Sequence, residues 1–306
     1  MATADTKPKH QEHIVLGMTA GLGAFLMFSV MFVFAKLLSD RHSVIEIAFY
    51  RNLIASMPFL FMAFVLGDRK ILVIRSKPTA VALRAVLGSM TIVVTFAAYS
   101  LMPMADTQAI LFASSLFIPV MGVVFLKERV GPWRWSAVLA GFAGVVVILR
   151  PSGDVYTLGI AVALTAAVMQ AVMQVVLRYL GGHEEPKTVT LYFFVIGTLV
   201  MALPLPFVAV TPTWGEIPLL FGVGLTGAVA QWLLSTAFRN APAAVVSIFN
   251  YSGIIWATAF GWLIWNDWPL PAVFIGAAIV IASNVLIIWR ESRLGRLAAP
   301  RAVDSG

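Results

Sequence analysis

Ten apolar stretches follow one another along this chain, and each is long enough to cross a bilayer as a helix. One helical crossing takes about 20 apolar residues. The chain is 60% hydrophobic and 11% charged, whereas soluble domains carry about 25% charged residues. The composition therefore predicts an all-α integral membrane protein and argues against a soluble enzyme. The stretches cover residues 14–38, 44–66, 78–101, 104–126, 133–150, 158–180, 188–210, 214–238, 242–265 and 270–290.

The basic residues indicate how these spans are oriented. With the N-terminus placed inside, 17 of the 21 Lys and Arg fall on or near the inner side. Only Lys36, Arg41, Arg51 and Arg150 fall on the outer side. Because cytoplasmic loops are enriched in Lys and Arg, we expect residues 1–13 and the basic residues 291–306 to be cytoplasmic tails. The expected location is the cell membrane (the inner membrane in a Gram-negative bacterium).

The two halves of the chain match each other at two constant offsets. An offset of 139 residues pairs Pro103 with Pro242, and an offset of 142 pairs Tyr50 with Tyr192. Chance matches among apolar residues are the alternative explanation. Because each half holds five spans, the second half would be inserted upside down, as in transporters built from inverted repeats. We expect ten transmembrane helices in two inverted five-helix repeats, residues 14–150 and 158–290. Further pairs are Glu128 with Asp267 and Pro132 with Pro271 at 139, and Met27 with Met169 and Lys36 with Arg178 at 142.

The close of the first half and parts of its second and third spans resemble a known family. The segments that carry the resemblance are Pro119, Leu126-Lys127-Glu128-Arg129-Val130, Arg134-Trp135, Gly141-Phe142-Ala143-Gly144, Leu149-Arg150-Pro151, Phe49-Tyr50-Arg51 with Pro58, and Leu83-Arg84 with Gly88. On these segments the chain resembles ten-helix transporters of the EamA type, within the drug/metabolite transporter superfamily, over roughly residues 14–290. Asn266-Asp267-Trp268 departs from the Gly-Glu pair usual in the second half.

This resemblance implies a carrier that exports or takes up amino acids, nucleotide-like metabolites or vitamins such as riboflavin or S-adenosylmethionine. It also implies that spans three, four, eight and nine surround a central path, which favours Gln108, Ser115, Gln231 and Asn250 as lining residues. The motifs select neither one cargo nor a direction.

Two arginines fall inside predicted spans. Arg51 lies about 12 Å from the outer end of the second span and Arg84 about 9–10 Å from the inner end of the third, at 1.5 Å per residue. A charge at the bilayer centre costs at least about 2.5–3.5 kcal/mol. Either the long side chains return their guanidinium groups to the interface, or these groups bind a carboxylate or phosphate in a water-filled cavity.

Uncharged polar and aromatic residues complete the predicted substrate site. Arg84, Gly88, Thr91, Thr95 and Tyr99 share one face of the third span because residues three and four apart are helix neighbours. Packing between helices is the alternative role for such a stripe. Trp232 and Trp256 could stack on a flat ring. The predicted substrate-binding residues are Arg51, Arg84, Thr91, Thr95, Gln108, Ser115, Gln170, Gln174, Gln231, Trp232, Asn250 and Trp256.

Two further sets of residues flank this site. Lys36, Glu46 and Asp106 lie near the outer face, where they form either an interfacial salt bridge or a vestibule that guides substrate toward Arg51. Pro58 and Pro119 interrupt the second and fourth spans, where proline removes a backbone hydrogen bond. They are hinge candidates, with static bends as the alternative.

Several absences limit the function classes. The chain has no cysteine, its four histidines fall in the tail or in loops, and no Asp or Glu falls in the middle of a span. A metal site or an intramembrane enzyme needs a convergent set of such groups, and no G-x-x-x-x-G-K-[ST] motif is present for direct use of ATP. The +7 charge lies beside the spans rather than in one patch, so we expect no nucleic-acid partner.

The sequence therefore predicts a secondary transporter that works by alternating access, with no catalytic residues, metal or cofactor. Its partners would be a small-molecule substrate and the lipid bilayer, with the chain a monomer or homodimer. The expected cargo is an amino acid or a similar anionic or zwitterionic metabolite. Uptake of riboflavin- or S-adenosylmethionine-type compounds and lipid flipping are the alternatives.

Overall fold

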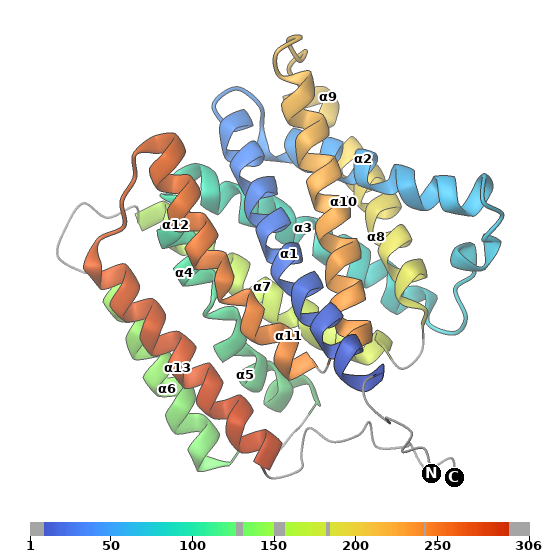
Figure 1. Ribbon diagram of the computed structural model, residues 1–306. Coiled ribbons are helices and arrows are strands. Elements are labelled where there is room, and N and C mark those ends of the chain that lie inside the picture. The colour runs from blue at the N-terminus through green and yellow to red at the C-terminus, as the bar shows by residue number, and fades with distance from the viewer. Residues whose placement is uncertain (1–8, 127–130, 150–156, 182–183, 242, 294–306) are drawn as a thin grey trace, which may run out of the picture.

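The computed structural model describes residues 9–126, 131–149, 157–181, 184–241 and 243–293 (Figure 1). Within these residues all regular structure is helical. The elements are α1 (Lys9–Leu38), α2 (Val44–Phe64), the 3-10 helix η1 (Arg69–Leu72), α3 (Pro78–Leu101), α4 (Met104–Leu111), α5 (Ser114–Leu126), α6 (Pro132–Leu149), α7 (Thr157–Gly181), α8 (Pro186–Ala202), α9 (Leu205–Val208), α10 (Ile217–Asn240), α11 (Ala243–Asn250), α12 (Ser252–Trp265) and α13 (Pro271–Arg293).

These helices confirm an all-α membrane fold, and their ends follow the predicted spans closely. In the described part of the chain, α1, α2, α3, α7 and α10 are each long and apolar enough to cross a membrane alone. The remaining crossings use shorter apolar helices, such as α6, α8 and α13. The turn residues explain the ends, because Pro78, Pro132, Pro186 and Pro271 each begin a helix, where a missing N–H costs nothing.

The fourth and ninth spans are each divided into two helices. In the fourth span, Ala113 donates to the carbonyl of Ile110 and Ser115 to that of Phe112, so the turn tightens to three-residue bonding. In the ninth span, Tyr251 donates to the carbonyl of Ile248 in the same way. Both interruptions occur without proline. They separate α4 from α5 and α11 from α12 at equivalent points of the two halves.

The seventh span is shorter than the predicted 188–210. Helix α8 ends at Ala202, and only the short α9 follows before the chain becomes irregular. Pro204 and Pro206 explain this end, because neither has an N–H to donate to a continuing helix. The loop from Ala209 to Glu216 then leads into α10.

Helices of the two halves pack against one another in an exchanged pattern. The first helix α1 lies along α10, and its counterpart α7 lies along α3 (Figure 1). The fifth spans α6 and α13 pack together, as do the second spans α2 and α8. Such exchange is what a two-fold axis between inverted repeats produces.

Candidate functional site

The two arginines predicted to bind substrate lie next to each other in the interior. Arg51 on α2 is 1% exposed and Arg84 on α3 is 5% exposed. Their guanidinium carbons lie 5.2 Å and 4.2 Å from the ring centroid of Phe193 on α8. Arg51 also lies 4.9 Å from the ring of Phe194. Neither side chain reaches the outer surface of the protein, so the alternative of return to the membrane interface is wrong.

The hydrogen-bonding capacity of this arginine pair is largely unused. Arg51 Nη1 donates to Asn52 Oδ1 at 2.8 Å, but the Nε atoms of both arginines and Nη1 of Arg84 are buried without a partner. Asn52 Nδ2 and Ser89 Oγ are also buried and unpartnered. Within the described residues no Asp or Glu forms an ion pair with either arginine. Two uncompensated buried cations are costly, and an anion between them would offset that cost.

Glycines on three helices leave the room that the arginine pair occupies. A Cβ atom on Gly88 would lie 2.7 Å from Arg84 Nη1 and 2.8 Å from a ring carbon of Phe193. One on Gly227 of α10 would lie 3.1 Å from Arg51 Nε. One on Gly197 of α8 would overlap Ser89 Oγ and lie 2.6 Å from Asn52 Nδ2. The site is therefore enclosed by α2, α3, α8 and α10.

The remaining polar face of α3 leads away from the arginines toward α4. Thr91 and Thr95 are buried. Their hydroxyl groups donate to the backbone carbonyls of Leu87 and Thr91, one turn earlier, at 2.7 Å. Their hydroxyl protons are thus used inside the helix, as the packing alternative expects. The Tyr99 hydroxyl donates to the side chain of Gln108, which is 9% exposed. Gln108 is therefore held in place between α3 and α4.

The other predicted substrate residues are spread over α5, α7, α10, α11 and α12. Ser115 donates to the carbonyl of Phe112 at 2.6 Å and lies within hydrogen-bonding range of the Tyr251 hydroxyl. Trp256 is half-buried, and its indole N–H is buried without a partner. The structure leaves Gln174 and Trp232 exposed, Trp232 at 63%. Half-buried side chains also occur at Gln170, Gln231 and Asn250.

The three predicted vestibule residues do not form one group. Lys36 Nζ donates to the carbonyl of Met102 at 2.6 Å and lies 5.3 Å from the ring centroid of Trp265. It forms no salt bridge with Glu46, so an interfacial bridge between these two residues is wrong. Asp106, in the first turn of α4, is half-buried and lies within electrostatic range of Lys36. Lys36 instead joins the ends of α1, α3 and α12.

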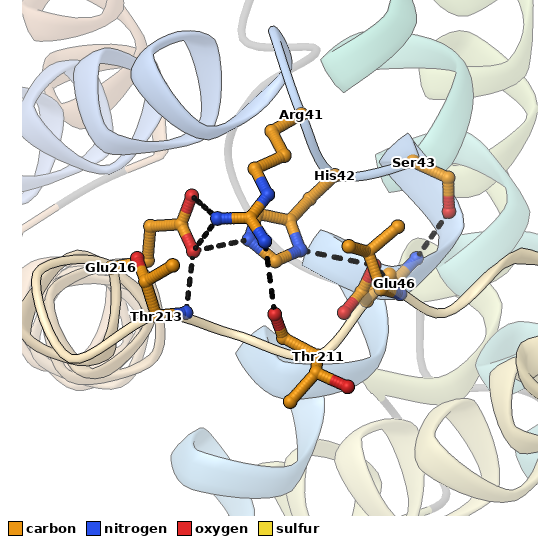
Figure 2. Close-up of polar contacts among 8 residues, drawn as sticks. Arg41, His42, Ser43, Glu46, Thr211, Thr213 and Glu216 are labelled. Atoms are coloured by element: carbon orange, nitrogen blue, oxygen red, sulfur yellow. Dashed lines mark hydrogen bonds and ion pairs between the residues drawn. The ribbon is translucent and has the colours of Figure 1, made fainter.

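Glu46 belongs to a separate charged cluster between α2 and the loop before α10 (Figure 2). Its side chain is fully buried, and Oε2 lies 3.1 Å from Nδ1 of His42 and accepts from the backbone N–H of Val210 at 3.2 Å. The other ring nitrogen of His42, Nε2, lies 3.3 Å from Oε2 of Glu216. Arg41 Nη1 donates to both carboxylate oxygens of Glu216 at 3.1 Å. We call His42, Glu46, Glu216 and Arg41 the first latch, because they join the first repeat to the second at one end.

Glu216 is anchored strongly enough to stay ionised in acid. The backbone N–H of Thr213 donates to it at 2.7 Å. This hydrogen bond, together with the nearby Thr213 hydroxyl, the ring of His42 and the charge of Arg41, lowers the pKa of Glu216 to about 2. The carboxylate of Glu216 therefore links the loop before α10 to Arg41 and His42, which follow the end of α1.

A second charged contact joins the repeats at the opposite end of α2. Glu184, before α8, accepts from the backbone N–H groups of Arg75, Ser76 and Lys77 at 2.7–2.8 Å. Burial raises the pKa of Glu184, but these backbone hydrogen bonds outweigh burial and lower it on balance. Arg75 also pairs with the exposed Glu185 at 3.2 Å. We call Glu184 with these three N–H groups the second latch.

The hinge role of the two prolines stays a prediction. Helix α2 runs unbroken through Pro58, which is exposed. Pro119 lies within α5, and its side chain is outside the described residues. The interruption of the fourth span lies earlier, at Phe112 and Ala113.

Two features of these sites were missed by the sequence analysis. Phe193 and Phe194 looked like ordinary apolar residues of the seventh span, and no local pattern connects them to Arg51 or Arg84. His42 was treated only as one of the histidines in the tail or in loops, whereas it is 2% exposed and lies between two carboxylates. Its burial depends on the loop before α10, which no local pattern connects to it.

Comparisons with known proteins agree with this architecture. The profile of the EamA-like transporter family matches residues 15–150 and again residues 157–289. A riboflavin transporter of Rhizobium johnstonii is 31% identical over 71% of this chain and 72% of its own length. The pseudopaline exporter of Pseudomonas aeruginosa is 28% identical over 89% of this chain and 95% of its own. An S-adenosylmethionine uptake transporter of Rickettsia bellii is 27% identical over 89% of this chain and 94% of its own.

A solved crystal structure shares the fold. It aligns with a TM-score of 0.64 over 91% of this chain and 98% of that one, at 18% sequence identity. At this identity the likeness concerns the fold alone.

Proposed function

Because this chain belongs to the EamA-like transporter family, we propose that it is a secondary carrier for a small metabolite with a carboxylate or phosphate group. The observation that carries the proposal is the arginine pair on the Phe193 ring, buried and without a carboxylate partner among the described residues. Guanidinium groups bind carboxylate and phosphate through paired hydrogen bonds. Arg51 and Arg84 would hold the anionic group, and Asn52 and Ser89 would supply further hydrogen bonds.

The experiment is a thermal-shift screen of the purified protein, because a ligand that binds only the folded state raises its apparent stability. The panel contains dicarboxylates, amino acids, phosphorylated metabolites, S-adenosylmethionine and the neutral riboflavin. Transport of the compounds that bind is then measured in liposomes. Loss of a hydrogen bond to a charged group costs about 1.5–3 kcal/mol, so Arg51→Gln and Arg84→Gln should each weaken binding about tenfold to hundredfold.

Arg290→Gln is the matched control. Arg290 also lies over an aromatic ring, 4.8 Å from the centroid of Trp133, but it is exposed. Its loss should leave binding unchanged. Transport that survives both Arg51→Gln and Arg84→Gln would contradict the anion site, while absence of transport for every compound would contradict the carrier.

A cargo of the vitamin or nucleotide type is the second candidate, favoured by the relatives named for riboflavin and S-adenosylmethionine. S-adenosylmethionine carries a carboxylate and suits the arginine pair, whereas riboflavin carries no anionic group. If riboflavin binds and neither Arg51→Gln nor Arg84→Gln changes its affinity, the predicted aromatic residues would be favoured as its binding site. Movement of labelled phospholipid without movement of any soluble metabolite would instead indicate a flippase.

We also propose that both termini are cytoplasmic in the cell membrane. The distribution of 17 against four basic residues supports this orientation. The chain contains no cysteine, so a single cysteine in place of Gly215, where a new side chain meets no atom within 4 Å, can be labelled selectively. Labelling of intact cells by a membrane-impermeant maleimide is the expected result, and labelling only after lysis would reverse the orientation.

A further inference from the structure

The first latch places both nitrogens of one buried imidazole against carboxylates (Figure 2). Nδ1 of His42 lies 3.1 Å from Glu46 and Nε2 lies 3.3 Å from Glu216. A neutral imidazole has one N–H donor and one lone pair, so it would turn a lone pair toward one of these carboxylates. Neither contact is an aligned hydrogen bond, because both ring nitrogens are buried without a hydrogen-bond partner. The ring can turn an N–H group toward each carboxylate only as an imidazolium, which holds one proton more than the neutral ring.

We propose that His42, Glu46 and Glu216 form a proton-binding site, and that the bound proton keeps the repeats joined at the α1–α2 end. His42 and Glu46 belong to the first repeat, whereas Val210 and Glu216 belong to the loop of the second repeat before α10. When the proton leaves, a lone pair faces a carboxylate in a buried position, which is unfavourable. The contact between the two loops then opens.

The other charged groups around His42 do not replace this proton. Arg41 is bound to Glu216 and to the carbonyl of Thr211. Asp40 is exposed and acts on Lys36. On α2, Tyr50 lies one turn beyond Glu46 and within its electrostatic range. When Glu46, Glu216 and Arg41 are all ionised, the first latch carries one net negative charge. One bound proton cancels this charge.

The second latch provides the contrast. Glu184 is satisfied by three backbone N–H groups, which do not titrate. The two contacts therefore differ, because Glu184 faces backbone N–H groups, whereas Glu46 and Glu216 face an imidazole ring that can bind a proton. If the chain is the carrier proposed above, proton binding here is linked to which end is open, but the site itself does not depend on the cargo.

The test uses distances between spin labels in the full chain, reconstituted in lipid nanodiscs and without any substrate. Asp40→Cys and Gly215→Cys, both at exposed loop positions, report on the first latch. Val73→Cys and Lys187→Cys, also exposed, report on the other end. Distances are measured at about pH 5 and about pH 8, which bracket the titration of ordinary histidines. We expect one short distance at the first latch in acid and an added longer distance in base, with no shift at the other end.

Three variants separate the effect of the proton site from a general loss of stability. His42→Gln should abolish the pH-dependent shift, whereas His10→Gln, at the far end of α1, should leave it intact. Glu216→Gln should keep the short distance at both pH values, because a neutral amide can donate to the lone pair of neutral His42. A parent protein without a pH-dependent shift, or a shift that persists in His42→Gln, would overturn the proposal. Both results are independent of transport.

Discussion

Phe112 and Tyr251 meet edge to face, with ring centroids 5.3 Å apart and ring planes at 84°. They are 139 residues apart, the offset that pairs the two halves of the sequence. They also mark the interruptions between α4 and α5 and between α11 and α12. Equivalent residues of two repeats can touch only near the axis that relates the repeats, so this contact locates the axis at the two interruptions.

We predict that this ring pair couples the two halves energetically. Aromatic pairs contribute about 0.5–1.5 kcal/mol beyond the area that they bury. Phe112→Leu and Tyr251→Leu should therefore destabilise the protein less in combination than the sum of the single changes. Thermal unfolding in detergent of the parent, both single variants and the double variant gives the coupling energy.

The control for this cycle combines Phe112→Leu with Phe59→Leu. Phe59 packs in a different hydrophobic cluster, against Phe194. Its effect and that of Phe112→Leu should add, because distant residues without shared partners are independent. Additive effects for Phe112 and Tyr251 as well would show that the contact does not link the repeats.

The ends of the spans could be predicted because hydropathy and proline act locally. The predicted third span, 78–101, coincides with α3, since Pro78 begins the helix and Pro103 follows its end. The interruptions at Phe112 and Tyr251 could not be predicted, because neither glycine nor proline marks them. They depend on three-residue backbone bonds and on serine hydroxyls that bond to the preceding turn, as in Ser115 and Ser252.

The arginine pair could likewise be predicted only in part, because its position in the sequence is a local feature and its surroundings are not. Hydropathy identified Arg51 and Arg84 as charges inside spans, but it left open whether they point inward. That depends on the ring of Phe193, from the other repeat, and on the room left by Gly88. Lys36 and Glu46 were expected near the outer face, whereas their contacts with Met102 and His42 follow from packing at the helix ends.

We predict that Gly88→Ala weakens substrate binding without unfolding the protein. The added methyl group would lie under 3 Å from Arg84 Nη1 and from Phe193, so the guanidinium group must shift. A loss of about tenfold in affinity, or about 1.4 kcal/mol, is expected by thermal shift with a compound that binds the parent.

Gly21→Ala is the matched control, because it changes another glycine inside a membrane-spanning helix. A Cβ atom there meets its nearest neighbour at 3.5 Å, an ordinary contact. Unchanged affinity is expected for this variant. Equal losses in both variants would mean that helical glycine in general, rather than the space beside Arg84, matters for binding.

We predict that Glu184→Gln destabilises the protein more than Glu185→Gln does. Glu184 accepts three backbone hydrogen bonds just before α3, where a carboxylate also favours the helix N-terminus. Glu185 forms an exposed ion pair with Arg75, and such pairs contribute little. Melting temperatures in the same detergent at neutral pH check this order, and similar melting temperatures for the two variants would contradict the structural role of the second latch.

On the acid side, the stability that Glu216 contributes should disappear only as the pH approaches 2. Its pKa is lowered to about 2 in the folded protein, from an ordinary value of 4.5. A group with a lowered folded-state pKa stabilises the protein above its unfolded pKa and loses this effect as the pH falls through the folded value. The difference in melting temperature between the parent and Glu216→Gln should therefore shrink as the pH falls from 4.5 toward 2. Glu185→Gln is the control, because it removes a carboxylate that lacks these contacts. If the difference in melting temperature between the parent and Glu216→Gln already vanishes near pH 4.5, then Thr213 and Arg41 do not hold the Glu216 carboxylate as the structure shows.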